Sequence, residues 1–256
     1  MGSRSGIPAD QLERYLEAGY VVASIDYRLA PETKLPAIIE DLQDAFSWLR
    51  SEGSGMLGTD PDRVGVVGSS AGGYLALMAG HCVQPSPRAL VSFYGYSDIV
   101  GSWFSQPDSF YNTFGPVAEA AARLAVGTQE IVDAPVAERW DYYLWCRQNG
   151  LWLDEVGGHD PHSEPGWFHY YCPAQNVSSP GISYPPTLLL HGDADTDVPH
   201  SQSVHMAGRL DSAGVDHELI TIPDGSHGFD KKASASEDPV VTAAIDKVLE
   251  FLRKHV

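Results

Sequence analysis

Lysine, cysteine and long hydrophobic runs are all scarce in this sequence. Five of its 16 Lys and Arg residues are lysine, against 34 Asp and Glu, and the formal net charge of the 256-residue chain is −18. Because such a surface repels the phosphates of nucleic acids and of anionic lipids, we expect no nucleic-acid partner. The apolar runs are far shorter than the roughly 20 residues of a membrane-spanning helix, so we expect no membrane partner either.

The three cysteines, Cys82, Cys146 and Cys172, are odd in number and lack the spacing of metal ligands. We interpret them as reduced, mostly buried thiols of an intracellular protein. The first ten residues contain no apolar segment of the kind found in a secretory signal. Together these features predict a cytoplasmic protein.

Three histidines are the strongest candidates for a metal site. His159, His162 and His169 lie near Asp160 in a Pro- and Gly-rich stretch, but their spacing is irregular. Zinc sites use shorter and more regular ligand spacings. The pattern therefore favours a solvated loop, and we expect neither a metal nor a cofactor.

The alternation of short β-branched runs with helical patterns predicts the fold class. Hydrophobic residues make up 43% of the chain and charged residues 20%, which is typical of a globular protein. Strands are predicted at residues 20–27, 64–68, 89–94, 187–191 and 217–222, and helices at residues 9–18, 36–52, 71–82, 201–213 and 239–255. This order favours an α/β fold with a mostly parallel sheet and helices on both faces.

The stretch from Tyr96 to Tyr171 contains no convincing strand and holds 15 of the 26 aromatic residues. One interpretation is a helical subdomain with a small core of its own. The other is a cap whose aromatic side chains wall an apolar pocket over an active site. The two interpretations are compatible, and both place a helical insertion between two parts of the sheet.

The segment Gly68-Ser69-Ser70-Ala71-Gly72 matches the pattern G-x-S-x-G between a predicted strand and a predicted helix. In that setting a serine lies on a sharp, strained turn with its hydroxyl exposed. We expect Ser70 to be a nucleophile, and the N–H of Ala71 to stabilise an oxyanion. Gly68 and Gly72 are expected to let strand and helix approach closely. The alternative is a chance Gly/Ser turn, because the short pattern alone is common.

A serine nucleophile needs a base and a carboxylate that orients the base. The segment after the predicted strand 217–222 contains His227 among small residues, and we expect it to be the base. The segment after strand 187–191 contains Asp193, Asp195 and Asp197, of which Asp195 is our choice for the orienting acid. The other two could close the turn or cap the following helix, and His227 could belong to an ordinary surface loop.

Four segments together resemble the α/β-hydrolase superfamily, in its hormone-sensitive-lipase-like and feruloyl-esterase-like (BD-FAE-like) carboxylesterase branches. They are DYRLAPE at 26–32, GSSAGG at 68–73, HGDADTDVP at 191–199 and GSHGF at 225–229. The resemblance implies an α/β-hydrolase fold, with Asp195 as the acid. It implies a core at residues 1–95 and 186–256, with a cap inserted at 96–185. Arg28 and Glu32, four residues apart, are expected to form a local ion pair.

One feature of the family is missing from the sequence. Relatives carry a His-Gly-Gly-Gly oxyanion loop and a strand before the segment that corresponds to residues 20–27, and neither is found here. Either Met1 is an internal position of a longer protein, or the chain closes the gap in another way, and we expect the first. The missing strand would lie between strands 20–27 and 64–68, so both would expose unpaired backbone groups. Pairing with a second copy would cover such an edge, which predicts a homodimer.

The function predicted from these motifs is that of a serine hydrolase acting on small to medium carboxylic esters, with a small-molecule ester as its partner. Ser70, His227 and Asp195 would form the catalytic triad. A peptidase of the prolyl-oligopeptidase-like type is a second interpretation, which the lack of a repeat segment disfavours. A third is a non-catalytic ligand-binding protein on the same fold, which the missing oxyanion loop favours.

Overall fold

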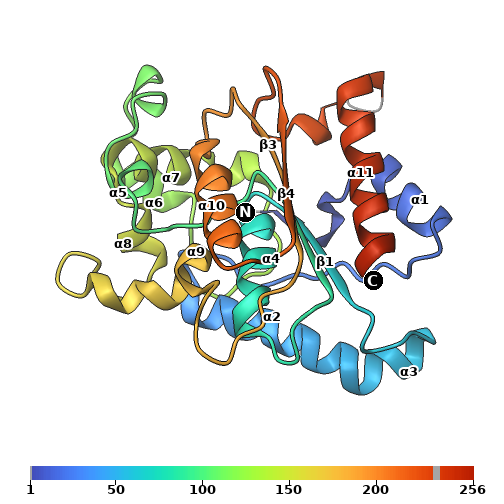
Figure 1. The fold of residues 1–256 in the computed structure, drawn as a ribbon. Coiled ribbons are helices and arrows are strands. Elements are labelled where there is room, and N and C mark those ends of the chain that lie inside the picture. The colour runs from blue at the N-terminus through green and yellow to red at the C-terminus, as the bar shows by residue number, and fades with distance from the viewer. Residues whose placement is uncertain (1, 233–236) are drawn as a thin grey trace. The chain divides into compact units, whose positions relative to one another are not determined.

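The computed structural model describes residues 2–232 and 237–256, and four strands of this part form one parallel sheet (Figure 1). The strands, in their order across the sheet, are β1 (Gly65–Ser69), β2 (Ala89–Phe93), β3 (Thr187–Gly192) and β4 (His217–Ile222). Ser69 pairs with Phe93, and Phe93 pairs with Leu190. The carboxyl ends of neighbouring strands therefore lie at the same edge of the sheet, where ligands bind in open α/β sheets.

Helices precede, separate and follow the strands. They are α1 (Ala9–Glu17), α2 (Leu35–Trp48), α3 (Ser54–Leu57), α4 (Ala71–Cys82), α5 (Ser102–Ser105), α6 (Glu119–Leu124), α7 (Val136–Asn149), α8 (Trp152–Val156), α9 (Pro173–Asn176), α10 (Ser201–Ser212) and α11 (Pro239–His255). A π-helical turn at Leu49–Gly53 joins α2 to α3. Short 3-10 turns lie at Arg4–Gly6, Tyr111–Thr113, Pro165–Tyr171 and Phe229–Lys231. Within residues 2–232 and 237–256, no helix is long and apolar enough to cross a membrane.

The chain forms two compact units. The first consists of the residues up to Gly6 together with Ser24–Leu42 and Ile99–His169, and the second of Ile7–Ala23, Gln43–Asp98 and the part from Tyr170 onward. The second unit contains all four strands. In the first unit, aromatic side chains of α7 form two small clusters, one around Tyr142 and Trp145 and one around Tyr143 and Tyr111. No strand longer than an isolated bridge occurs between residues 96 and 171, as the sequence predicted.

The core of the second unit lies on both faces of the sheet. Val91 of β2 packs in a cluster with Ile245 of α11. The preceding residue of β2 is Leu90, and its side chain faces α4. A Cβ added to Gly80 of α4 would lie 3.0 Å from that side chain. Because successive side chains of a strand point to opposite faces, α11 and α4 cover opposite sides of the sheet. The predicted α/β-hydrolase arrangement, a parallel sheet with helices on both faces, is confirmed.

Most predicted elements are present, and three of them have the expected bounds. The strand at 217–222 and the helices at 71–82 and 239–255 match β4, α4 and α11 without a shift. Other ends differ by one or a few residues, as ends of elements generally do. The largest difference lies in the predicted helix 36–52, which ends as α2 at Trp48 and continues as the π-helical turn.

The predicted strand at residues 20–27 is wrong. This segment has no regular structure, and among the described residues β1 is paired with β2 alone. The side chain of Ser24 instead donates to the carbonyl of Arg4, whose N–H donates to Asp26. A strand exists only where a neighbouring strand accepts and donates its ladder of hydrogen bonds. The apolar β-branched run is present, but no described strand lies beside it.

The predicted ion pair between Arg28 and Glu32 is also wrong. Arg28 binds Asp41 at 2.8 Å and Glu130 at 3.2 Å, while Glu32 binds Arg139 at 2.6 Å. Residues four apart face one another only on a helix, and the chain is irregular from 28 to 29 and turns at 30–32. The Glu32–Arg139 pair is buried on both sides, with side-chain exposures of 1% and 6%, so it ties two distant segments of the first unit together.

Candidate active site

The turn between β1 and α4 holds Ser70 in a strained conformation. Ser70 has φ 56° and ψ −121°, in a region that costs a non-glycine residue about 1–3 kcal/mol. Its N–H donates to the carbonyl of Phe93 at 2.9 Å, and its carbonyl accepts from the N–H of Tyr74 at 2.9 Å. These two bonds hold the serine at the carboxyl edge of the sheet, at the first turn of α4.

The expected steric role of the glycines holds at Gly68 and not at Gly72. A Cβ added to Gly68 would lie 2.1 Å from the carbonyl oxygen of Gly72, so the strand and the helix approach too closely for any side chain there. A Cβ on Gly72 would meet nothing within 4 Å. The second close approach occurs instead at Gly73, whose Cβ would lie 2.9 Å from the carbonyl oxygen of Phe93. Gly72 therefore contributes its backbone, not its lack of a side chain.

Ala71 is the first residue of α4. The first N–H groups of a helix have no acceptor within the helix and carry its partial positive charge. The Ala71 N–H therefore belongs to the group of donors that the start of α4 presents beside the Ser70 hydroxyl. This is the position that the sequence predicts for an oxyanion donor.

The loops after β3 and β4 are fastened to one another. A Cβ on Gly192 would lie 2.0 Å from the carbonyl oxygen of Gly225, so the two loops cross with no room for a side chain. The N–H of Ala194 donates to that same carbonyl at 3.1 Å, and the N–H of Asp224 donates to the carboxylate of Asp193 at 2.7 Å. Asp193 thus closes the junction of the loops, whereas no side chain of either alternative aspartate caps α10.

The structure brings together the three side chains that the motifs predict. Ser70 Oγ lies 3.0 Å from His227 Nε2, and His227 Nδ1 lies 2.8 Å from Asp195 Oδ2. Since an ionised carboxylate accepts only, Nδ1–H donates to Asp195, and Nε2 is left to accept the Ser70 proton. The second oxygen of Asp195 accepts from the N–H groups of Asp197 at 2.8 Å and Val198 at 2.9 Å. All these residues belong to the second unit.

Hydrogen bonds and nearby charges set the protonation states of Asp195 and His227. Burial by itself would raise the pKa of Asp195, but hydrogen bonds from His191 and His227 outweigh it and hold that pKa well below its ordinary value. Burial by itself would lower the pKa of His227, but the hydrogen bond to Asp195 and the charge of Asp197 raise it above its ordinary 6.5. Asp195 is therefore ionised near neutral pH and stabilises a proton on His227.

His191 is a residue of the site that sequence reasoning missed, because it was assigned only as the end of a strand. Its side chain is fully buried, and its Nε2 lies 3.3 Å from Asp195 Oδ2. The single Nε2–H is shared between Asp195 and the carbonyl of Val198, which lies at 2.9 Å, and the hydroxyl of Ser203 donates to Nδ1 at 2.7 Å. A polar side chain that ends an apolar strand four residues before the acid was the signal available in the sequence.

Tyr94 is a second residue that the motifs did not indicate. It follows β2 with φ 39°, and its ring centre lies 4.6 Å from that of His227. Its hydroxyl donates to the buried carboxylate of Asp230 at 2.5 Å, and Gln11 donates to the other oxygen at 2.9 Å. Tyr94 therefore packs against the imidazole from the neighbouring strand.

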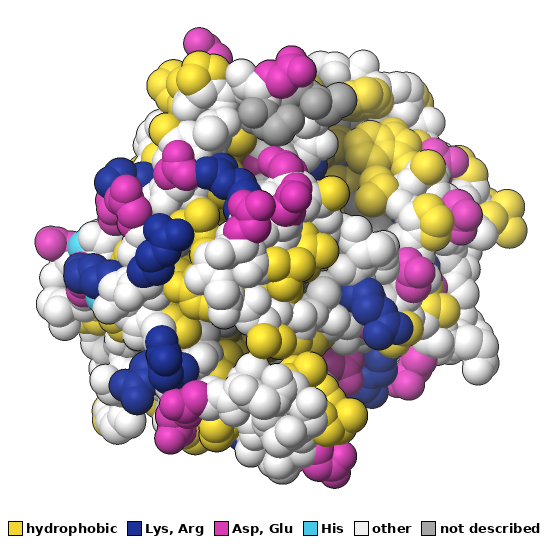
Figure 2. Space-filling model, turned by 90° about the vertical axis from the view of Figure 1, so that its right-hand side faces the viewer, with side chains coloured by type: hydrophobic (Ala, Val, Ile, Leu, Met, Phe, Trp, Pro, Cys, Tyr) yellow, Lys and Arg dark blue, Asp and Glu magenta, His cyan; other side chains and the backbone are white. Residues whose placement is uncertain are grey.

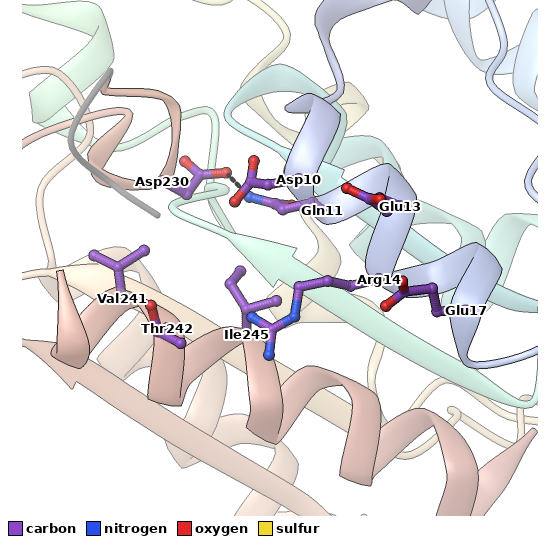
Figure 3. Close-up of a pocket in the computed structure, with 9 residues that line it drawn as sticks. All are labelled: Asp10, Gln11, Glu13, Arg14, Glu17, Asp230, Val241, Thr242 and Ile245. Carbon is purple, nitrogen blue, oxygen red and sulfur yellow. Dashed lines mark hydrogen bonds between the residues drawn. The ribbon is translucent and has the colours of Figure 1, made fainter. Parts of the chain in front are cut away.

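A pocket of about 370 Å³ opens between α1 and α11 beside this buried carboxylate (Figure 3). Figure 3 shows Gln11 directed at Asp230, with Ile245 and Val241 of α11 opposite. Its lining consists of Asp10, Gln11, Glu13, Arg14, Glu17, Asp230, Val241, Thr242 and Ile245. This lining does not include Ser70, Asp195 or His227, so the pocket is separate from the site that these three residues form.

The residues considered for metal binding have other contacts. Within the described part of the chain, no group of three or more His, Cys, Asp or Glu side chains is placed to hold a metal ion. His159 pairs with Glu164 at 2.6 Å and stacks on Trp167, while His162 pairs with Asp154 at 2.9 Å.

The cysteines are buried, as predicted, and unpaired with one another. Burial raises the pKa of the Cys82 and Cys146 thiols to about 12. A thiol reacts as its thiolate, so both groups are unreactive near neutral pH.

Comparison with known proteins identifies the family. A model of the α/β-hydrolase fold family matches residues 10–231, and the chain belongs to that family. The resemblance stated from the sequence motifs to the α/β-hydrolase superfamily is thereby confirmed.

Curated relatives are much longer proteins. The chain is 26% identical over 303 residues to the non-reducing polyketide synthase ausA of Emericella nidulans, and covers 12% of that protein. It is 27% identical over 303 residues to the non-reducing polyketide synthase mapC' of Penicillium brevicompactum, and covers 14% of it. In both comparisons all of this chain is matched.

Solved structures share the fold. A Staphylococcus aureus protein of unknown function superposes with a TM-score of 0.79 at 22% identity, over 100% of this chain and 85% of its own. An α/β-hydrolase superfamily protein from Enterococcus faecalis gives 0.78 at 24% identity, over 99% and 86%. Carboxyl esterase 2 from Tuber melanosporum gives 0.65 at 21% identity, over 96% and 71%. At these identities the likeness concerns the fold.

Proposed function

We propose that this chain is a serine hydrolase that cleaves small to medium carboxylic esters. The observation that carries the proposal is the pair of hydrogen bonds from Ser70 to His227 at 3.0 Å and from His227 to Asp195 at 2.8 Å. A hydroxyl beside a basic imidazole, with a carboxylate on the far nitrogen, is the arrangement that activates serine for attack on a carbonyl.

The reaction follows from this geometry in two halves. Ser70 Oγ attacks the ester carbonyl while His227 Nε2 takes its proton, and the N–H of Ala71 donates to the oxyanion. As the tetrahedral intermediate collapses, His227 gives the proton to the departing alcohol, which leaves an acyl group on Ser70. Water then attacks the acyl-enzyme, with His227 again as base, and releases the acid and free Ser70. Throughout, Asp195 stabilises the protonated imidazole and fixes its tautomer.

Replacing the nucleophile is the direct test. We expect Ser70→Ala to lower kcat/KM for 4-nitrophenyl butyrate by about 10⁴-fold or more, because no other group forms the acyl-enzyme. The wild type should react with a fluorophosphonate probe at Ser70, and the variant should not. Ser69→Ala, one residue earlier on the same turn, serves as the control and should keep its activity within about tenfold. Undiminished turnover by folded Ser70→Ala would contradict the proposal.

A matched pair of substrates separates the esterase from the peptidase interpretation. The 4-nitrophenyl ester and the 4-nitroanilide of one acyl group differ only in the bond that is broken. An esterase hydrolyses the first and leaves the second nearly untouched. If folded wild-type protein hydrolyses neither and is not labelled by the probe, the ligand-binding interpretation replaces the proposal.

A further inference from the structure

A second carboxylate lies against the reacting nitrogen of His227. Asp197 Oδ2 is 3.4 Å from His227 Nε2, the nitrogen that is also 3.0 Å from Ser70 Oγ. Asp195 binds the opposite nitrogen and its side chain is fully buried, whereas the Asp197 side chain is 22% exposed. The imidazole thus has an inner carboxylate and an outer one, and the outer one lies on the side of the nucleophile.

The position of Asp197 follows from the same loop that places the acid. Its N–H donates to Asp195 Oδ1 at 2.8 Å, so the backbone bond that anchors Asp195 also fixes the residue two positions later. Its place beside Nε2 is therefore built into the loop after β3. In the proposed reaction Nε2 gives its proton to the departing alcohol, so the alcohol part of a bound ester lies next to this negative charge.

We propose that Asp197 is a specificity-determining residue that disfavours esters with an anionic alcohol group and favours neutral or cationic ones. This inference rests on the proposed function of Ser70. The groups that face His227 are the Ser70 hydroxyl, the ring of Tyr94 and the charges of Asp195, Asp197 and Lys231. Lys231 is the single cation of this set, so the carboxylates outnumber it two to one.

The size of the effect follows from Coulomb's law at a partly exposed site. For two like charges several Å apart near a protein surface, we expect a penalty of about three- to tenfold in kcat/KM. Salt screens exposed charges over a Debye length of about 10 Å at 0.1 M. The discrimination should therefore weaken as the ionic strength rises.

Two esters with one acyl group measure the discrimination. The pair is 2-nitrophenyl butyrate and 4-(butyryloxy)-3-nitrobenzoate, whose leaving group carries a carboxylate. Asp197→Asn, which removes the charge and keeps the shape, should lower the neutral-to-anionic ratio of kcat/KM about three- to tenfold. Asp193→Asn removes a charge from the same loop but not from His227, and should leave the ratio unchanged.

The pH profile gives a readout that a purely structural role would not move. Ser70 needs neutral His227, so activity is lost as the pH falls through the His227 pKa. Asp197 favours the protonated imidazole, so Asp197→Asn should lower that pKa and extend activity to more acidic pH. NMR titration of His227 in the resting protein should give the same shift without any turnover.

The outcomes separate the two proposals. If Asp197→Asn leaves both the substrate ratio and the His227 pKa at their wild-type values while Ser70→Ala is inactive, the inference fails and the proposed function stands. Equal shifts in Asp197→Asn and Asp193→Asn also overturn it. If wild-type protein hydrolyses no ester, the proposed function fails together with the specificity role. The NMR titration then still decides whether Asp197 acts on His227.

Discussion

Gly192 lies where the loop that carries Asp195 crosses the loop that carries His227. Its Cα lies so close to the backbone of Gly225 that an added Cβ would be 2.0 Å from the Gly225 carbonyl oxygen. A side chain in the way could move aside, but the atoms that a methyl group on Gly192 would meet belong to the backbone of Gly225. Gly192 lies three residues before Asp195 and Gly225 two residues before His227, so a shift of either backbone would move these side chains apart.

We expect Gly192→Ala to destabilise the protein by about 2–4 kcal/mol and to reduce ester hydrolysis, because the two loops must separate to admit the methyl group. Gly208→Ala is the matched control. Gly208 lies within α10, and a Cβ there meets nothing within 4 Å, so this change should be neutral or stabilise by up to about 1 kcal/mol. Urea denaturation of both variants measures the difference, and equal free energies of unfolding would contradict the expectation.

The three residues named from the motifs, Ser70, Asp195 and His227, are the ones that lie within hydrogen-bonding distance. Each lies in the loop that follows a strand, so the parallel order of the strands brings all three to one edge of the sheet. The contacts of His191, Tyr94 and Asp197 could not be predicted in this way. They depend on the path of loops and on a ring packed from a neighbouring strand, which no local pattern of residues encodes.

At the scale of elements, β1 has a neighbouring strand on one side only among the described residues. It lies at the end of the sheet, and Val67 at its centre is 38% exposed. Segments such as β4, α4 and α11 were predicted with their bounds because their own residues carry the signal. The segment 20–27 was not, because a strand is defined by a partner as much as by its own β-branched residues.

An exposed apolar edge strand is a site for association between chains. We expect wild-type protein to associate with rising concentration and Val67→Lys to reduce this association, since a charge on an edge strand opposes pairing. Val204→Lys places the same charge on α10, where Val204 is 49% exposed, and should leave association as in the wild type. Sedimentation velocity over a range of concentrations provides the measurement, and identical behaviour of the two variants would count against a role for this edge.

At the scale of the whole molecule, the excess of acidic groups dominates. Figure 2 shows acidic and basic side chains interspersed on one face, yet the formal net charge is −18. Local pairs such as Lys254 with Asp216 and Lys247 with Glu250 neutralise a few carboxylates only. The remaining charges repel one another, and this repulsion disfavours the compact state.

Salt should therefore stabilise the folded chain. We expect Tm at pH 7.5 to rise by about 2–5 °C between low salt and about 0.5 M NaCl, because screening weakens the repulsion. The rise should shrink as the pH approaches the sequence pI of about 4.7, where the net charge vanishes. Differential scanning calorimetry at both pH values tests this, and a Tm that falls with salt at pH 7.5 would show that attractive pairs outweigh the repulsion.

The division of the chain into two units has a consequence for how such a molecule can diversify. The chain leaves the sheet-bearing unit after Asp98, close behind β2, and returns at Tyr170, ahead of β3. The hydrogen bonds that join Ser70, His227 and Asp195 all lie within that unit. A different segment spliced between these two points would leave those hydrogen bonds in place, but it would also have to supply a partner for Glu32, whose buried pair with Arg139 crosses from residues 24–42 to the inserted segment. The inserted segment can therefore vary only in step with residues 24–42, while the residues around Ser70 stay as they are.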